Sequence, residues 1–184
     1  MEIIETNIPD VKVITPKKHG DHRGSFAETF NCKALAAAGI EADFVQDNQS
    51  YSAAKGVVRG LHFQIPPFAQ GKLVRVLRGS ILDVAVDLRR SSPTFKHHVA
   101  VQLSAENFKQ IFVPKGFAHG FVTLVTDTEI LYKVTDYYAP DHERGLMWND
   151  PDLGIDWPVN ADDAVLSSRD RELSHLSDLT DLFD

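Results

Sequence analysis

A succession of short runs rich in β-branched and aromatic residues, each followed by residues typical of turns, is the feature that most constrains this sequence. The runs occupy residues 11–15, 24–30, 44–52, 57–63, 72–77, 81–88, 97–103, 110–113, 120–124 and 129–134. Short strands at such regular spacing are typical of a mainly antiparallel sandwich or barrel. The sequence therefore predicts an all-β fold.

Turn and helix signals fall between these runs. The tripeptide Arg78-Gly79-Ser80 lies between two of them and predicts a tight hairpin turn. Asn31 is a favourable N-cap for a short helix over residues 34–38, and Gly39 is placed to end that helix in a left-handed conformation. We expect this helix to be one of only two in the chain.

The second helical signal lies in the C-terminal tail, residues 168–182. Its apolar residues recur at a three-residue step, which is closer to the helical period than to the strand period; they are Leu173, Leu176, Leu179 and Leu182. We therefore expect a helical tail that packs on the barrel or on a partner subunit. No repeat and no linker rich in Pro, Gly or Ser divides the chain, which predicts a single domain over residues 1–184.

Composition narrows the class of protein. Of the 184 residues 43% are hydrophobic and 24% charged, which is typical of a globular protein. The formal net charge of −7 argues against bulk nucleic acid as a partner, because that role needs a basic surface. A single cysteine, Cys32, the absence of a secretory signal at the N-terminus and the absence of a long apolar window predict a cytoplasmic protein with no membrane partner.

One strand carries a candidate base. In Arg59-Gly60-Leu61-His62-Phe63-Gln64, alternation places His62 on a polar face with Gly60 and Gln64, and Leu61 and Phe63 on an apolar face. A polar face inside a barrel is costly unless it lines a ligand cavity. His62 is thus a candidate base, although this motif alone equally allows a structural histidine.

Three further segments carry candidate groups. Lys72 shares a strand face with Val74 and Val76, opposite Leu73 and Arg75, so it can project into the same interior or be a solvated strand lysine. A Pro-Gly corner before the strand at 120–124 presents His119. Tyr132 is a plausible weak acid, because a phenol with a pKa near 10 can protonate an enolate, although tyrosines in such a run usually serve packing.

The histidines do not form a metal-binding pattern. His97 and His98 are adjacent and would face opposite ways on a strand, while His19 and His22 lie in a glycine-rich turn. No G-x-G-x-x-G or Walker sequence is present. We therefore expect no metal and no cofactor.

Taken together, these segments resemble the dTDP-4-dehydrorhamnose 3,5-epimerase family over roughly residues 3–170. The resemblance rests on an ordered series of motifs, which is more specific than any one of them: Asp21-His22-Arg23-Gly24-Ser25-Phe26-Ala27-Glu28, Gln46-Asp47-Asn48-Gln49-Ser50, Arg59 to Gln64, Gln70 to Val76, Asp83 to Arg89, Val113 to Phe121, Tyr132 to Tyr138, Trp148-Asn149-Asp150-Pro151 and Ser167-Ser168-Arg169-Asp170. It implies a cupin-like double-stranded β-helix, that is, a jelly-roll barrel.

The resemblance also implies a reaction. The substrate, dTDP-4-dehydro-6-deoxy-D-glucose, has a C4 ketone that acidifies the hydrogens on C3 and C5, and both centres are inverted on the way to dTDP-L-rhamnose, a precursor of cell-surface polysaccharide. By the family pattern His62 is the base, Asp170 orients its imidazole, and Lys72 stabilises the negative charge on the C4 oxygen. Tyr132 returns a proton from the opposite face.

The same resemblance implies substrate contacts and a partner. The contacts are Arg23, Phe26, Glu28, Gln46, Asn48, Arg59, Lys72, His119, Tyr138, Glu143 and Arg169. Arg23 and Arg59 suit a diphosphate, and Phe26 or Tyr138 can stack on thymine. Position 169 is Arg where lysine is common in the family, which changes the donor geometry. The family pattern also implies a homodimer in which an N-terminal segment exchanges with the partner's sheet and residues cross into its site.

Two alternatives remain at this point. A relative that epimerises only C3 or only C5 of another dTDP-4-ketosugar would carry nearly the same motifs. A non-catalytic nucleotide-sugar-binding barrel would keep Arg23 and Arg59 but would have no use for His62, Lys72 and Tyr132 together.

Overall fold

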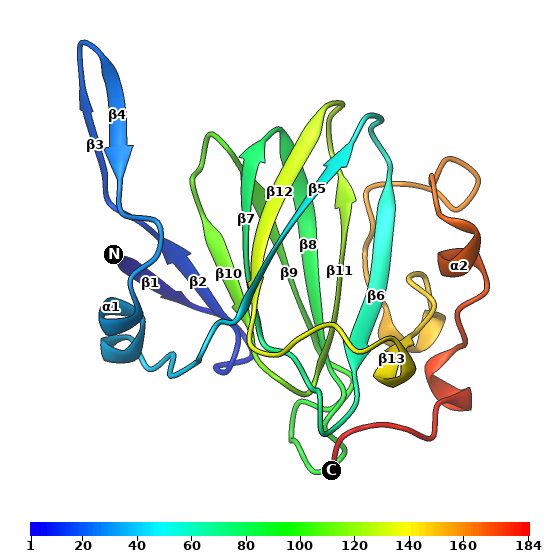
Figure 1. Ribbon diagram of the computed structural model, residues 1–184. Helices are drawn as coiled ribbons and strands as arrows, with labels where there is room; N and C mark the ends of the chain where they lie inside the picture. Colours follow the sequence, from blue (N-terminus) through cyan, green and yellow to red (C-terminus); the bar gives the residue numbers. More distant parts are fainter.

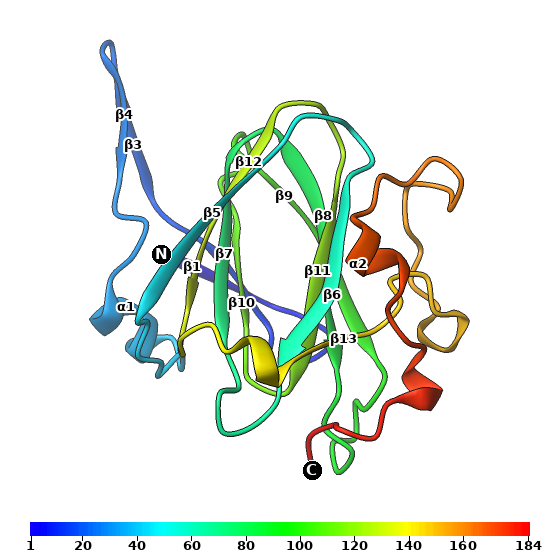
Figure 2. The same cartoon turned by 45° about the vertical axis from the view of Figure 1, so that its right-hand side comes forward.

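Two antiparallel sheets face one another in the computed structural model, which describes residues 1–184 (Figures 1 and 2). The six-stranded sheet has the order β1-β2-β10-β7-β12-β5, with β1 at Glu2–Glu5, β2 at Lys12–Thr15, β10 at Gln110–Val113, β7 at Lys72–Arg78, β12 at Thr128–Val134 and β5 at Gln46–Ser52. The five-stranded sheet has the order β13-β6-β11-β8-β9, with β13 at Glu143–Gly145, β6 at Val58–Gln64, β11 at Phe117–Thr123, β8 at Ser80–Asp87 and β9 at His98–Ser104. This confirms the predicted all-β, cupin-like jelly roll.

Apolar side chains fill the space between the sheets. The largest core cluster joins Val74, Val76 and Ile130 of the six-stranded sheet to Ile81 and Leu103 of the five-stranded sheet. A second cluster covers the outer face of the five-stranded sheet. Because β8 is buried on both faces, its sequence is an almost continuous apolar run rather than an alternating one.

The two sheets are joined at Gly79 by a corner, and the predicted hairpin at Arg78-Gly79-Ser80 is wrong. β7 pairs with β10 and β12, whereas β8 pairs with β9 and β11, so the chain passes from one sheet to the other at this glycine. Gly79 has φ 80°, and a Cβ there would collide with Oγ1 of Thr128 and lie 3.0 Å from its Cα. A hairpin and a corner demand the same turn residue, which is why the local sequence did not separate them.

The first predicted helix is present as α1, Cys32–Ala37. The Asn31 side chain accepts from the backbone N–H groups of Lys33 and Ala34, as expected for an N-cap. Gly39 has φ 79°, the left-handed conformation predicted for the end of the helix.

The predicted helix over 168–182 is wrong. Only Ser168–Arg171 is helical, as α2, and the chain then runs irregularly to a 3₁₀ turn, η3, at Leu176–Asp178. Its leucines nevertheless pack on the five-stranded sheet, and isolated bridges join Leu146 to Ser174 and Arg89 to Phe183. A three-residue apolar step fits a 3₁₀ turn and an extended segment that buries every third side chain, and here the contacts with the sheet decide.

Several elements were not predicted. They are β1, β3 at Lys18–Asp21, β13, and the 3₁₀ turns η1 at Pro140–His142 and η2 at Pro151–Leu153. β3 pairs with β4, Gly24–Ala27, in a hairpin that stands away from the sheets (blue in Figures 1 and 2). Nearly every residue of this hairpin is exposed. In the structure as a whole, no helix is long and apolar enough to cross a membrane.

Candidate active site

Two adjoining cavities between the sheets contain most of the predicted site residues. The first, of about 320 Å³, and the second, of about 240 Å³, are both lined by His62, Lys72 and Tyr132. These three side chains come from β6, β7 and β12, and therefore from both sheets. His62 and Lys72 lie on the inward strand faces that alternation predicted.

His62 is held by Asp170. Its Nε2 lies 2.7 Å from Oδ1 of Asp170, whose side chain is only 6% exposed. Ser167 caps α2 and accepts from the backbone N–H of Asp170, which fixes the carboxylate at the start of that helix. Burial alone would raise the pKa of Asp170, but the hydrogen bond and charge of His62 hold it below its usual value. An ionised Asp170 that accepts from Nε2 leaves Nδ1 of the neutral imidazole free to take a proton.

Lys72 is buried beside this pair. Its Nζ donates to the backbone carbonyl of His62 at 3.3 Å. Burial lowers the pKa of Lys72 to about 8, while the negative charges of Asp83 and Glu143 act in the opposite direction. The ammonium is thus a poorly solvated cation, and it is available to an anionic atom in the cavity.

Tyr132 lies on the six-stranded sheet, opposite Asn48 of β5 and Val74 of β7. Burial raises the pKa of Tyr132, with Arg59 lowering it and Glu143 raising it further. The phenol therefore stays protonated near neutral pH and can act as a donor.

His119 forms a second imidazole–carboxylate pair in the first cavity. Its Nε2 lies 2.9 Å from Oδ2 and 3.0 Å from Oδ1 of Asp83, which is fully buried on β8. Sequence reasoning gave Asp83 no role. An acidic residue inside the apolar run Ile81-Leu82-Asp83-Val84-Ala85 was the available signal, because a buried carboxylate needs a partner.

The second cavity contains amide and aromatic groups. Nε2 of Gln46 donates to Oδ1 of Asn48 at 2.9 Å, and the phenol of Tyr138 donates to Oε2 of Glu143 at 2.7 Å. Arg169, on α2, lies 2.7 Å from the same Glu143 oxygen. Gln64 and Gln70 also line this cavity and were not predicted as site residues.

Arg59 lines the first cavity only. Its Nε donates to Oγ of Ser52 at 3.3 Å and its guanidinium donates to the backbone carbonyl of Tyr51 at 3.1 Å. Both partners belong to β5, so the guanidinium is held against the rim of the six-stranded sheet.

Three predicted contacts do not reach either cavity. Arg23, Phe26 and Glu28 lie on or next to the β3–β4 hairpin and are exposed to solvent. Arg23 is paired with Asp21 at 2.6 Å, and Phe26 is 74% exposed. Within one chain the structure therefore brings together the residues of the sheets but not those of the hairpin.

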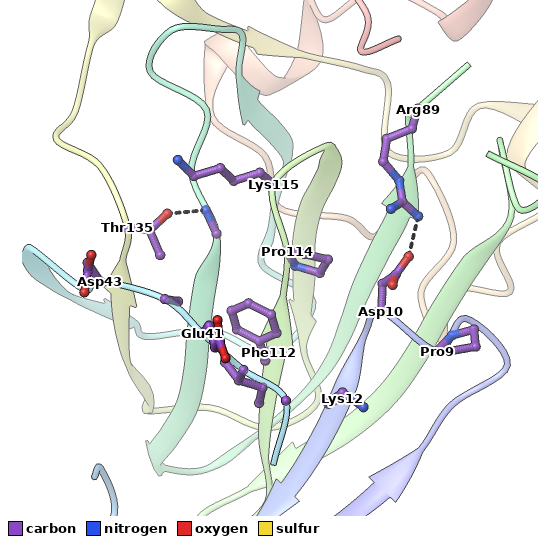
Figure 3. A pocket seen from close by; sticks show the side chains of 14 residues that line it. Pro9, Asp10, Lys12, Glu41, Asp43, Arg89, Phe112, Pro114, Lys115 and Thr135 are labelled. Atoms are coloured by element: carbon purple, nitrogen blue, oxygen red, sulfur yellow. Dashed lines mark hydrogen bonds and ion pairs between the residues drawn. The ribbon is translucent and has the colours of Figure 1, made fainter. Parts of the chain in front are cut away.

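A larger cavity of about 710 Å³ contains none of the predicted site residues (Figure 3). It lies beside the segment that follows α1, and its Arg89 pairs with Asp10 at 2.8 Å. Its acidic and basic side chains occur together, which gives it no clear preference for an anion or a cation. Nowhere in the structure do three or more His, Cys, Asp or Glu side chains gather so as to hold a metal ion.

Known proteins resemble this chain along most of its length. The family model described as dTDP-4-dehydrorhamnose 3,5-epimerase matches residues 5–178. An enzyme of that name from Pseudomonas aeruginosa is 54% identical over 173 residues, 94% of each chain. A Bacillus anthracis structure of the same name, with TDP and pyrophosphate bound, superposes with a TM-score of 0.92 at 52% identity and covers 95% of this chain and 99% of the other. The 3,5-epimerase of Legionella pneumophila, solved with dTDP-4-keto-L-rhamnose, superposes with a TM-score of 0.92 at 48% identity. The match covers 97% of this chain and 94% of the other.

Proposed function

Because this chain belongs to the dTDP-4-dehydrorhamnose 3,5-epimerase family and is therefore an isomerase, we propose that it converts dTDP-4-dehydro-6-deoxy-D-glucose to dTDP-4-dehydro-L-rhamnose. The observation that carries this proposal is the convergence of His62, Lys72 and Tyr132 on one place between the sheets. A base, a cation and a weak acid are the groups that epimerisation beside a ketone requires.

The first step is removal of a proton by His62. Its free Nδ1 takes the hydrogen from C3 or C5, and the C–H electron pair moves into the ring to form an enolate at C4. The imidazolium that results is stabilised by Asp170, 2.7 Å from Nε2. One base can serve both centres in turn, because both are adjacent to the same carbonyl.

Lys72 stabilises the enolate. Its ammonium is already desolvated, so it need not shed water when negative charge develops on the C4 oxygen. Such a preorganised donor in a dry site contributes about 3 to 4 kcal/mol to the stabilisation of a transition state.

Tyr132 completes the inversion. It donates its phenolic proton to the same carbon from the face opposite His62, and the enolate electrons form the new C–H bond. The tyrosinate then regains a proton from solvent while the His62 imidazolium releases one, which restores the starting protonation states. The elevated pKa of Tyr132 supports this role, since the phenol is fully protonated before each turnover.

The second cavity suits the nucleoside. Gln46 and Asn48 offer amide donors and acceptors for the thymine edge, and Tyr138 offers an aromatic face. With the nucleoside there, the hexose extends into the first cavity, beside Lys72 and Arg59.

We further propose that the active unit is a homodimer. A two-stranded hairpin with nearly every residue exposed is marginally stable by itself, and the aromatic side chain of Phe26 on it is mostly exposed to solvent. Insertion of this hairpin at the mouth of the partner's cavities would bury Phe26 and supply Arg23 and Glu28 to the bound nucleotide. The cytoplasmic location and the independence from cofactors stay predictions.

Hydrogen–deuterium exchange tests the chemistry. The ketosugar is incubated with the protein in D2O, and NMR follows deuterium incorporation at C3 and C5. A coupled reductase that consumes only the epimerised product measures inversion. The wild-type protein should exchange and invert both centres. His62→Ala should lose both exchanges, whereas Tyr132→Phe should lose inversion more than exchange.

The matched controls are His97→Ala and Tyr51→Phe, since both residues are exposed and absent from the two cavities. Epimerisation at a normal rate by His62→Ala would overturn the assignment of the base. Exchange at a single carbon by the wild-type protein would instead identify a mono-epimerase. Tight binding of the ketosugar without exchange at C3 or C5 would identify a non-catalytic barrel.

A further inference from the structure

Ser50 is a polar residue of the first cavity that neither the sequence motifs nor the proposed chemistry uses. It lies on β5, where inward residues alternate with exposed ones: Gln46, Asn48, Ser50 and Ser52 point inward. Ser50 lines the first cavity, together with His62, Lys72 and Tyr132, but not the second.

The hydroxyl of Ser50 has no hydrogen-bond partner. Its Oγ is the only buried side-chain nitrogen or oxygen in the structure for which none is found. The other inward polar residues of the strand are satisfied, since Gln46 donates to Asn48 and Ser52 accepts from Arg59. A buried hydroxyl without a partner is unfavourable for folding, so its position at a ligand cavity indicates that the partner is supplied by the ligand.

The register of β5 indicates which part of the ligand meets the Ser50 hydroxyl. Gln46 pairs with Val134, Asn48 with Tyr132, and Ser50 with Ile130. Ser50 is therefore about 7 Å beyond the level of Tyr132, on the side away from Gln46 and the second cavity. If the nucleoside occupies the second cavity, the hexose is the part of the substrate that reaches Ser50.

We propose that Ser50 hydrogen-bonds a hydroxyl of the hexose and so helps to hold the ring between His62 and Tyr132. This inference rests on the proposed function for the identity of the ligand. In the ketosugar only C2 and C3 carry free hydroxyls, and a neutral serine can both donate to and accept from such a group.

Two ligands separate the hexose from the rest of the nucleotide. The dissociation constants of dTDP and of dTDP-glucose, a hydroxylated sugar that cannot enolise, are measured by calorimetry for the wild-type protein and for Ser50→Ala. We expect Ser50→Ala to weaken the binding of dTDP-glucose by ~5–10-fold, the usual effect of losing one neutral hydrogen bond. The dissociation constant of dTDP should not change. Its melting temperature should not fall, because an unsatisfied hydroxyl is removed.

Two variants serve as controls for indirect effects. Gln49→Ala changes an outward residue of the same strand, bonded to Glu129, and should alter neither constant. Ser50→Thr keeps the hydroxyl on a residue suited to a strand and should retain the preference for the hexose.

Equal weakening of both ligands by Ser50→Ala would identify a phosphate contact and overturn the proposal. Unchanged affinity for both ligands, or a clear loss of stability, would overturn it as well. A wild-type protein that binds dTDP-glucose but does not epimerise the ketosugar would refute the proposed function without deciding the role of Ser50, which the two constants still measure.

Discussion

Lys72 shows how a single buried residue ties the chemistry to pH. Its pKa of about 8 lies below the ordinary 10.5, since burial disfavours the ammonium more than Asp83 and Glu143 favour it. Only the charged form can stabilise an enolate oxygen. The shift therefore brings the loss of this charge from strongly alkaline pH to mildly alkaline pH.

We expect kcat/KM to fall as the pH rises through about 8, the pKa of Lys72 in the free enzyme. Lys72→Arg should remove this alkaline limb, because a guanidinium stays charged throughout the range, although its different shape should lower the overall rate. The check is a pH profile of kcat/KM for both proteins. A wild-type profile that stays flat between pH 7 and 9.5 would contradict the role of the ammonium.

Asp83 provides a second test of the same electrostatics. Its negative charge raises the pKa of Lys72 against the effect of burial. Asp83→Asn removes that charge, so the alkaline limb should move to lower pH, and binding should also weaken because His119 loses its carboxylate partner. The displacement of the limb is the informative readout, since a purely structural defect would lower kcat/KM without moving it.

At the scale of elements, the corner at Gly79 determines how the two sheets meet. A Cβ there would collide with Oγ1 of Thr128, the first residue of β12, whereas a Cβ at Gly154 would meet nothing within 4 Å. Both glycines have positive φ, at 80° and 57°. They form a matched pair that differs in packing but shares a left-handed backbone.

We expect Gly154→Ala to lower the free energy of unfolding by about 1 kcal/mol, the cost of a left-handed alanine. Gly79→Ala should lower the free energy of unfolding by about 1 to 3 kcal/mol more than Gly154→Ala does, because its methyl group also overpacks the corner. Denaturant unfolding of both variants measures the difference. Equal losses would show that the corner relaxes around the methyl group.

Strand positions followed from the sequence because each strand carries a local pattern, either an alternation of inward and outward residues or a short apolar run bounded by turn residues. The inward face of β5 and the apolar runs of β8 and β11 have such local patterns. The tail carried no such information, since its leucines at a three-residue step fit a helix and a 3₁₀ turn alike. Its conformation depends on contacts with Leu61 and Val84 of the five-stranded sheet and with Leu146, which follows β13.

At the scale of the whole molecule, the hairpin raises the question of assembly. Arg23, Phe26 and Glu28 belong to the family motif, yet in a single chain they lie away from both cavities. We therefore predict that a second copy brings them to the cavities, in the homodimer proposed above.

Subunit complementation tests this arrangement. Arg23→Ala should weaken substrate binding by ~10–100-fold through loss of a charge-assisted contact, and His62→Ala should be inactive. A heterodimer purified through two different tags contains one site with both residues intact if the hairpin serves the partner. We expect such heterodimers to recover about half of the wild-type activity, because one of two equivalent sites is restored. Heterodimers no more active than Arg23→Ala alone would show that each hairpin serves its own chain.

The candidate site was predictable in its residue types and only partly in its geometry. His62, Lys72 and Tyr132 came from strand alternation and family motifs, and all three line the cavities. Asp83 and Ser50 were missed as site residues because their importance lies in what surrounds them. One is a fully buried carboxylate paired with His119, and the other is a buried hydroxyl paired with nothing.

The sequence by itself determined most of the strands, the first helix and its caps, and the residues able to do the chemistry, because each is recorded in a local pattern of a few residues. Only the tertiary structure decided that the chain changes sheets at Gly79, that the tail is mostly not helical, and that His119 meets Asp83 across 36 residues. These outcomes depend on packing between distant segments, whose free energy no local pattern contains.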